Sequence, residues 1–208
     1  MAIRVPASGD LEEARSRVEP YVHRTPVVTS RNIDSIAGST LFFKCENFQR
    51  VGAFKYRGAT NAVFSLSDEE ARRGVATHSS GNHAQALALA ARTRGIRSYI
   101  VMPTSSPDVK INAVRRYGAD ITFCEPTLEG REKALERVVK RTGATFIHPY
   151  NDPRVIAGQS TASMELLEDT NDLDMVMTPV GGGGLLSRVD HFVRLLQHFV
   201  ANGTNAAG

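Results

Sequence analysis

Residues 51–59 read VGAFKYRGA and place a single lysine, Lys55, between Phe54 and a run of small residues. Burying a lysine ammonium is costly unless its charge is paired or chemically removed. A lysine that is partly removed from water loses proton affinity and becomes a good amine nucleophile toward aldehydes. Taken alone, the stretch also fits an ordinary solvated lysine on a helix face. Two later loops favour the nucleophile.

These loops are SSGNH at residues 79–83 and four consecutive glycines at residues 181–184. Glycines let the backbone approach an anion closely, and the N-terminus of a following helix adds a favourable dipole. The spacing matches neither a GxGxxG dinucleotide motif nor a P-loop, which argues against a nicotinamide-binding protein. A flexible turn and an ordinary helix cap are the alternatives for the two loops taken singly. Together with Lys55, the loops are what an aldehyde-bearing, phosphorylated cofactor requires.

The composition is that of an ordinary globular protein: 208 residues, 41% hydrophobic and 23% charged, with a formal net charge of +3. No block of lysine and arginine suggests a nucleic-acid surface, and no run approaches the ~20 apolar residues of a membrane span. Cys45 and Cys124 are the only cysteines and are expected to be small hydrophobes rather than nucleophiles. We therefore expect no nucleic-acid or membrane partner, no metal site, and a reducing, cytoplasmic location.

Between residues 74 and 150, short apolar stretches alternate with helical segments that end at glycine. The expected strands are 75–77, 98–102, 121–124 and 145–148, and the expected helices are 84–93, 108–117 and 128–141. A glycine after each helix supplies the left-handed residue that a helix end favours. This alternation predicts parallel βαβ units. We therefore expect a small α/β domain at 74–150, inserted into a larger domain made of 1–73 and 151–187.

The larger domain is expected to hold helices at 11–22, 54–66 and 157–168, a strand at 40–44, and a buried strand at 174–180 that leads into Gly181. The tail, residues 188–208, follows a different pattern. It carries an apolar stripe typical of one face of an amphipathic helix, made of Phe192, Leu195, Leu196, Phe199 and Val200.

From about residue 11 to about residue 187 the chain resembles fold-type II pyridoxal-phosphate enzymes, and within them the serine racemases and serine/threonine ammonia-lyases. The resemblance rests on the Lys55 stretch, on the two loops, and on RTPV at 24–27, FFKCE at 42–46 and VIAGQ at 155–159. It implies a three-layer αβα fold of two domains, similar to the tryptophan synthase β subunit. Because full-length relatives continue well beyond the point where the resemblance stops, the larger domain is expected to be incomplete.

The resemblance also implies roles for single residues. Lys55 would hold pyridoxal 5'-phosphate and act as base at the substrate's Cα, and Ser80 would act on the opposite face. The remaining cofactor contacts would come from Phe54 against the ring, Asn82 at the ring oxygen, and Gly181, Gly182, Gly183, Gly184 and Leu185 around the phosphate. The substrate carboxylate would be seated by Ser79, Ser80, Asn82 and His83, with Arg131 nearby.

The function implied by the resemblance is that of a serine racemase with L-serine and L-threonine ammonia-lyase (dehydratase) activity. Ser80 favours the racemase, because relatives that do not racemise tend to have alanine at this position. A divalent metal and ATP belong to some longer relatives, but their metal ligands have no match here. The alternative is a catalytically impaired, truncated form that pairs with full-length subunits. A homodimer is the other partner arrangement that we expect.

Overall fold

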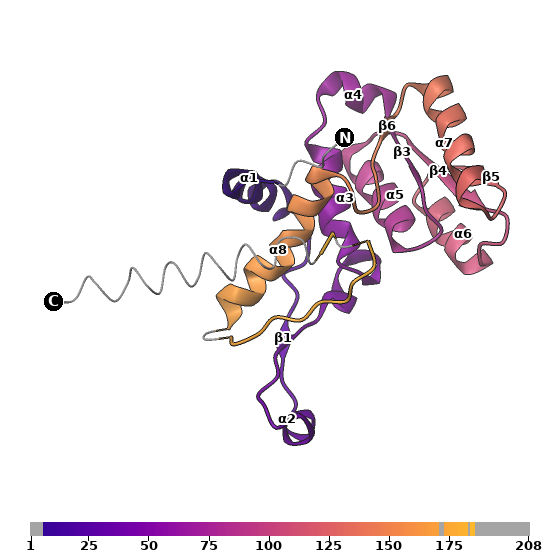
Figure 1. Ribbon diagram of the computed structural model, residues 1–208. Coiled ribbons are helices and arrows are strands. Elements are labelled where there is room, and N and C mark those ends of the chain that lie inside the picture. The colour runs from indigo at the N-terminus through magenta and orange to yellow at the C-terminus, as the bar shows by residue number, and fades with distance from the viewer. Residues whose placement is uncertain (1–5, 171–172, 183, 186–208) are drawn as a thin grey trace.

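The computed structural model describes residues 6–170, 173–182 and 184–185, and the following account is confined to them. Figure 1 shows two parts side by side. One part is a sheet with helices on both faces, and the other is a group of helices with a long hairpin below it. Helix α3 (Lys55–Phe64) lies between the two parts. The predicted division at residues 74 and 150 into two domains stays a prediction.

The sheet consists of four parallel strands in the order β5-β4-β3-β6. Their bounds are Val75–His78 for β3, Ser98–Pro103 for β4, Asp120–Cys124 for β5 and Thr145–Phe146 for β6. Ala76 and Val101 point to the face covered by helix α7 (Leu128–Thr142), whereas Val75 and Ile100 point to the opposite face. This alternation is the period of two expected of strands. The predicted βαβ alternation is therefore confirmed, and the carboxyl ends of the strands meet at one edge.

The opposite face of the sheet is covered by α5 (Asn82–Arg94) and α6 (Asp108–Arg116). The predicted glycines do end the helices of this part. Gly95 caps α5 and Gly143 caps α7, both left-handed with φ of 76° and 68°, and Gly118, just after α6, has φ of 81°. The two cysteines are both free, Cys124 buried and Cys45 only partly so.

The second part is built on three packed helices, α1 (Ser8–Val18), α3 and α8 (Pro153–Asp169). Helices α3 and α8 approach so closely at Gly58 and Gly158 that a methyl group at either would lie 2.6–2.7 Å from backbone atoms of the other helix. Helix α3 also packs on α5, which explains why it is buried from Tyr56 to Val63. A central helix of this kind carries Lys55 at its first position.

Below these helices, β1 (Val27–Val28) and β2 (Phe43–Lys44) form a short antiparallel pair around α2 (Arg31–Ala37). The sequence patterns did not indicate α2, nor α4 (Asp68–Arg73), and β2 is shorter than the strand expected at 40–44. Two 3-10 turns, η1 (Glu46–Phe48) and η2 (Arg50–Gly52), lead from β2 to α3.

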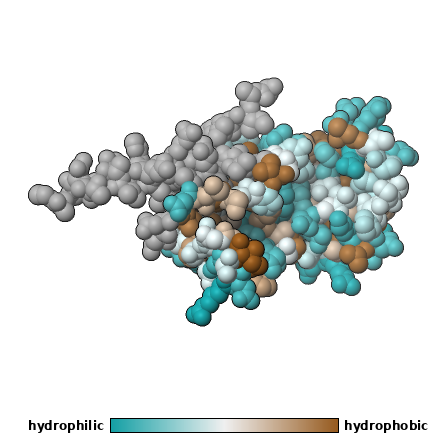
Figure 2. All heavy atoms as spheres, turned by 60° about the horizontal axis from the view of Figure 1, so that its bottom comes forward, coloured by the Kyte–Doolittle hydropathy of each residue, from teal (hydrophilic) through white to brown (hydrophobic). Residues whose placement is uncertain are grey.

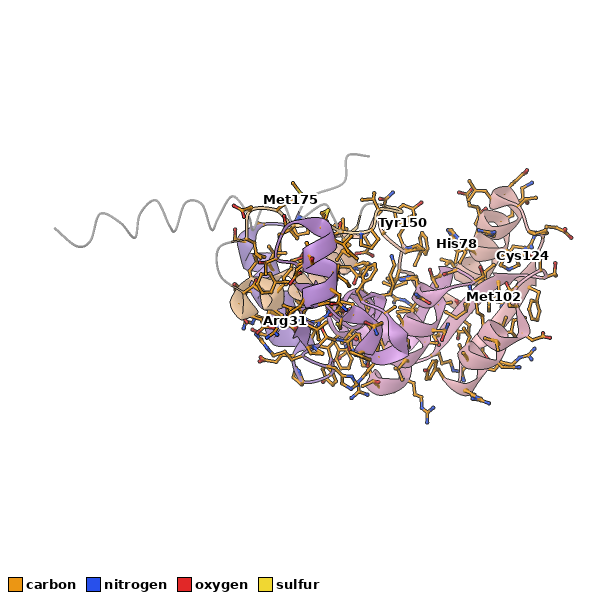
Figure 3. The ribbon with its side chains drawn as sticks, turned by 90° about the horizontal axis from the view of Figure 1, so that it is seen from below. Arg31, His78, Met102, Cys124, Tyr150 and Met175 are labelled. Carbon is orange, nitrogen blue, oxygen red and sulfur yellow. The ribbon has the colours of Figure 1, made fainter. Side chains whose placement is uncertain are left out.

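The predicted buried strand at 174–180 is wrong. Among the described residues, 173–180 form no strand, and Met175, Met177 and Val180 are 74%, 77% and 62% exposed. Figure 2 shows such hydrophobic residues in brown on the surface, and Figure 3 shows Met175 pointing outward. A strand needs a neighbour for its backbone N–H and C=O groups, and no described segment pairs with this one. The predicted helix in the tail and Gly183 lie outside the described residues.

A cavity of about 470 Å³ lies beside this unpaired segment. Residues of the β2 hairpin and of α8 form its other walls, and Phe54 and Leu185 line it as well. Its lining is mainly apolar, which is typical of a surface that binds a partner or a ligand.

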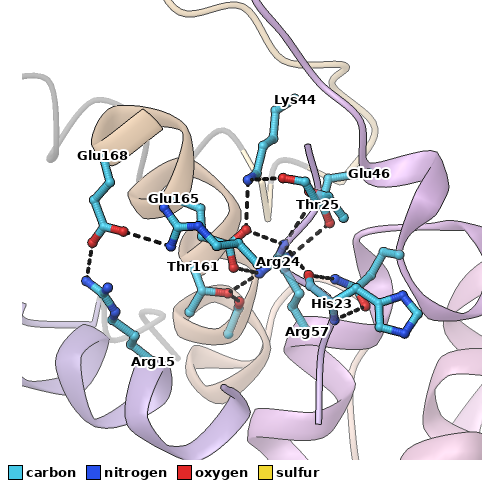
Figure 4. A network of polar contacts seen from close by, with 12 residues as sticks. Arg15, His23, Arg24, Thr25, Lys44, Glu46, Arg57, Thr161, Glu165 and Glu168 are labelled. Atoms are coloured by element: carbon cyan, nitrogen blue, oxygen red, sulfur yellow. Dashed lines mark hydrogen bonds and ion pairs between the residues drawn. The ribbon is translucent and has the colours of Figure 1, made fainter. Parts of the chain in front are cut away.

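A buried ionic cluster joins the segments of the second part (Figure 4). We call Arg57, Glu46, Glu165 and Lys44 the Arg57 cluster. The fully buried Arg57 guanidinium donates to both carboxylate oxygens of Glu46 at 2.8 and 2.9 Å, and to both of Glu165 at 2.7 and 2.8 Å. Lys44 Nζ lies 2.8 Å from the Glu165 carboxylate. Burial raises the pKa of Glu165, but hydrogen bonds and charges from Arg57 and Lys44 outweigh it, so the pKa lies below its usual value.

We predict that Arg57→Ala destabilises the protein by about 3–5 kcal/mol, because it leaves two buried carboxylates without their shared partner. Urea unfolding at pH 7 measures the loss. Arg73→Ala is the control, since Arg73 pairs with the exposed Glu69 on the same helix and should cost about 0–1 kcal/mol. Equal, small losses in the two variants would contradict the importance of the Arg57 cluster.

Candidate active site

An unusual turn precedes Lys55, the first residue of α3. Val51 and Gly52 have φ of 58° and 69°, two successive left-handed residues. A β-branched residue in this region is strained, which a surrounding structure must compensate. The turn allows Phe54 and Lys55 to begin the helix directly after Ala53, the last extended residue.

The Lys55 amine is half-buried and held by a backbone carbonyl rather than by an acid. Nζ donates to Pro149 O at 2.9 Å and lies 5.3 Å from the centre of the Phe54 ring. Among the described residues, no carboxylate forms an ion pair with it. Burial therefore lowers the pKa of the Lys55 ammonium. This is the environment in which a lysine amine becomes nucleophilic.

The loop at 79–83 lies at the carboxyl edge of the sheet, directly after β3. Ser79 N donates to Val101 O at 3.1 Å, and Gly81 N donates to Ser79 Oγ at 3.3 Å. Gly81 is the N-cap of α5 and has no side chain with which to cap it. The half-buried Ser80 and the exposed Asn82 therefore stand at a helix N-terminus whose dipole favours an anion.

His83 joins this loop to the surroundings of Lys55. Its ring is buried, with Nε2 3.4 Å from Ile147 O, and Nδ1 has no hydrogen-bond partner in the described structure. Burial and the nearby Lys55 charge lower the pKa of His83 to about 3. The ring is therefore neutral near pH 7, and the Ile147 carbonyl that it contacts lies two residues before Pro149, whose carbonyl accepts the Lys55 hydrogen bond.

Arg131, on α7, reaches the same edge of the sheet. Its Nε is buried and has no partner among the described residues. Burial lowers the pKa of His78, the last residue of β3, and the positive charge of Arg131 lowers it further. Figure 3 shows His78 between Tyr150 and Cys124 along this edge. Arg131 thus leaves a cationic group near the loop at 79–83.

The glycine loop meets the segment that holds Lys55. A methyl group at Gly182 would lie 2.2 Å from Tyr150 Cγ, and one at Gly184 would lie 3.2 Å from Tyr150 O. Tyr150 follows Pro149, whose carbonyl accepts the Lys55 hydrogen bond. The structure therefore brings the Lys55 stretch and the described glycines together, although they are far apart in sequence. The contacts of Pro149 and Tyr150 were not predicted, because no motif marks a backbone carbonyl or a packing ring.

These features fit pyridoxal phosphate. The amine that would hold the cofactor has a lowered pKa. In the loop that would hold the phosphate, Gly182 packs so closely on Tyr150 that no side chain fits at that position. The individual roles predicted for Phe54, Lys55, Ser80, Asn82 and the glycines stay predictions. In the described part of the chain, no group of three or more His, Cys, Asp or Glu could hold a metal ion. None of the helices described there combines the length and hydropathy needed to cross a membrane.

Comparison with known proteins identifies the family. The family model "Pyridoxal-phosphate dependent enzyme" matches residues 18–196. The chain is 54% identical over 183 residues to a beta-hydroxyaspartate dehydratase of Paracoccus denitrificans, and 52% identical over 178 residues to a serine racemase of Dictyostelium discoideum. These alignments cover 88% and 86% of this chain, but only 58% and 55% of the two relatives.

Solved structures agree with this result. The serine racemase of Dictyostelium discoideum superimposes with a TM-score of 0.87 at 49% identity, covering 90% of this chain and 61% of that one. For the maize serine racemase the TM-score is 0.91 at 47% identity, with 93% and 59% covered. The chain belongs to the pyridoxal-phosphate dependent enzymes. The predicted resemblance and the predicted α/β fold class are both confirmed.

We predict that His83 stays neutral well below pH 6, with an NMR titration midpoint near 3. Because its pKa is lower in the folded than in the unfolded protein, the unfolded state takes up the proton first as the pH falls below about 6.5. His83 therefore removes up to about 1.4 kcal/mol of stability per pH unit below that point. The slope of unfolding free energy against pH should decrease in His83→Gln. A His83 ring that titrates near pH 6.5 would contradict this.

Proposed function

We propose that this chain provides the cofactor-binding and proton-transfer groups of a serine racemase that also acts as an L-serine and L-threonine ammonia-lyase. The observation that carries the proposal is the Lys55 amine, which is partly buried, has no acidic partner among the described residues, and is bound by Pro149 beside the described glycines. The named relatives support the substrate class, because serine racemases and a hydroxyaspartate ammonia-lyase of yeast are among them.

In this proposal, bound pyridoxal phosphate supplies an electron sink for the charge left when the substrate's Cα loses its proton. Lys55 holds the cofactor and moves that proton on one face of Cα. Ser80 moves a proton on the opposite face. Racemisation needs both groups, whereas elimination of the β-hydroxyl needs only the first.

The other predicted site residues would bind and orient the cofactor and the substrate. Phe54 lies against Lys55 and would pack on the cofactor ring, Asn82 would donate to the ring oxygen, and Gly181–Gly184 with the Leu185 N–H would surround the phosphate. Ser79 and His83 would help Ser80 and Asn82 to seat the substrate carboxylate. Arg131 Nε, which has no hydrogen-bond partner in the described part of the chain, supports a further contact with that anion.

We further propose that turnover needs more of the family fold than this chain carries. The chain spans about 55–61% of the relatives' length, and the unpaired segment at 173–180 leaves apolar side chains exposed beside a cavity. A second copy or a full-length subunit would cover this face. The two free cysteines support a cytoplasmic location. Metal and ATP sites are no part of the proposal for these residues.

We predict that adding pyridoxal phosphate to the purified chain produces a visible absorbance band distinct from that of the free cofactor. Lys55→Ala should abolish the band, because the amine that holds the cofactor is gone. Lys133→Ala is the matched control, since Lys133 is an exposed lysine on α7, and its band should be unchanged. A spectrum equal to that of the free cofactor in the unsubstituted chain would overturn the proposed function.

We predict that Ser80→Ala removes D-serine formation at least about tenfold more strongly than pyruvate formation from L-serine, because only racemisation needs the second face. The two products are measured in a chimera that joins this chain to the remaining part of the Dictyostelium serine racemase. Equal loss of both products would show that Ser80 shapes the site instead of moving a proton.

A further inference from the structure

The turn at residues 148–151 contacts both halves of the proposed cofactor site. Pro149 O accepts the hydrogen bond from Lys55 Nζ at 2.9 Å. The next residue, Tyr150, packs its ring against Gly182 and its backbone against Gly184. Two consecutive residues of one turn therefore touch the amine and the glycine loop.

His148 makes this turn rigid. Its Nδ1 accepts hydrogen bonds from the backbone N–H groups of Asn151 at 2.9 Å and Tyr150 at 3.3 Å. The His148 ring meets the Tyr150 ring edge to face, with centroids 4.5 Å apart and an interplanar angle of 87°. Burial and the neighbouring His78 charge lower the pKa of His148, so its Nδ1 keeps the lone pair that both bonds need.

The contact at Gly182 leaves no room for a side chain. A Cβ atom there would lie 2.2, 2.4 and 2.5 Å from Tyr150 Cγ, Cδ1 and Cδ2. The obstacle is the base of the ring, which cannot turn away as the end of a flexible side chain could. Around a Cβ atom added at the neighbouring Gly181, no atom of the described residues lies within 4 Å. Two adjacent glycines of one loop therefore differ in a way that the sequence does not show.

We propose that Tyr150 is a positioning residue for the cofactor: its ring is the surface on which the glycine loop rests, and it fixes the distance from that loop to the Lys55 amine. Gly182 is glycine because Tyr150 occupies the place of its side chain. The inference rests on the proposed function, since it takes the glycine loop to be the phosphate site. It adds a residue for which the resemblance assigned no contact.

The test uses the purified chain and two ligands, pyridoxal phosphate and pyridoxal without the phosphate, titrated by absorbance. We expect Gly182→Ala to weaken pyridoxal phosphate binding about tenfold or more, because the displaced loop loses hydrogen bonds to a charged group. Pyridoxal binding should change much less. Gly9→Ala is the matched control, since no described atom lies within 4 Å of a Cβ added at Gly9, on α1 outside the proposed site; it should bind both ligands within about twofold of the unsubstituted chain.

Substitutions at Tyr150 complete the experiment. Tyr150→Phe keeps the ring and should bind as the unsubstituted chain does, whereas Tyr150→Ala should weaken binding of the phosphorylated ligand. In Gly182→Ala combined with Tyr150→Ala, the added methyl group occupies space that the ring has left. The combined loss should therefore be smaller than the product of the single losses.

If the affinity losses of the two single variants multiply in the double variant, the inference is wrong. Equal loss of binding in Gly9→Ala and Gly182→Ala would overturn it as well. The midpoint of thermal unfolding without ligand tests the packing alone: Gly182→Ala should lower it and Tyr150→Ala should reduce that effect. An unsubstituted chain that binds neither ligand would refute the proposed function, while the unfolding midpoints would still decide whether Gly182 and Tyr150 pack together.

Discussion

The arrangement of the second part of the structure depends on one buried charge. Arg57 lies in the interior of the protein, where an unpaired guanidinium would be very costly, and it is paired by Glu46 from η1 and Glu165 from α8. Glu165 in turn needs Lys44. The positions of β2, η1, α3 and α8 are therefore coupled, because displacing any one of them removes a partner from a buried charge.

This constraint also fixes the orientation of Lys55, the candidate active-site lysine, through the geometry of α3. Lys55 and Arg57 are two residues apart on α3, so they point to different sides of the helix. Arg57 anchors one side to α8, and the close approach at Gly58 and Gly158 prevents the helices from separating or rotating freely. On the other side, Lys55 is directed toward Pro149. The same first turn is thus held by charges on one side and carries the half-buried Lys55 amine on the other.

Local sequence patterns were sufficient to predict the sheet and the helices that cover it. Alternating apolar stretches and glycine stops predicted β3 to β6 and α5 to α7 within a few residues, because each element buries its apolar side against a neighbour close in sequence. The glycines and Lys55 were recognised as candidate site residues for a similar reason, since phosphate and aldehyde chemistry require those residue types. The strand at 174–180 failed because a strand is decided by its neighbours, and the described residues provide none.

The contacts made by the turn at 148–151 could not be read from the sequence either, and the reason is general. Pro149 acts through a carbonyl that every residue possesses, and Tyr150 acts through the space its ring fills, so neither leaves a residue-type signal. Both lie in the connection between β6 and α8, which leaves the carboxyl edge of the sheet. The candidate site residues are recognisable by their type, but the turn that contacts them becomes apparent only in the structure, where Pro149 meets Lys55 and Tyr150 meets Gly182.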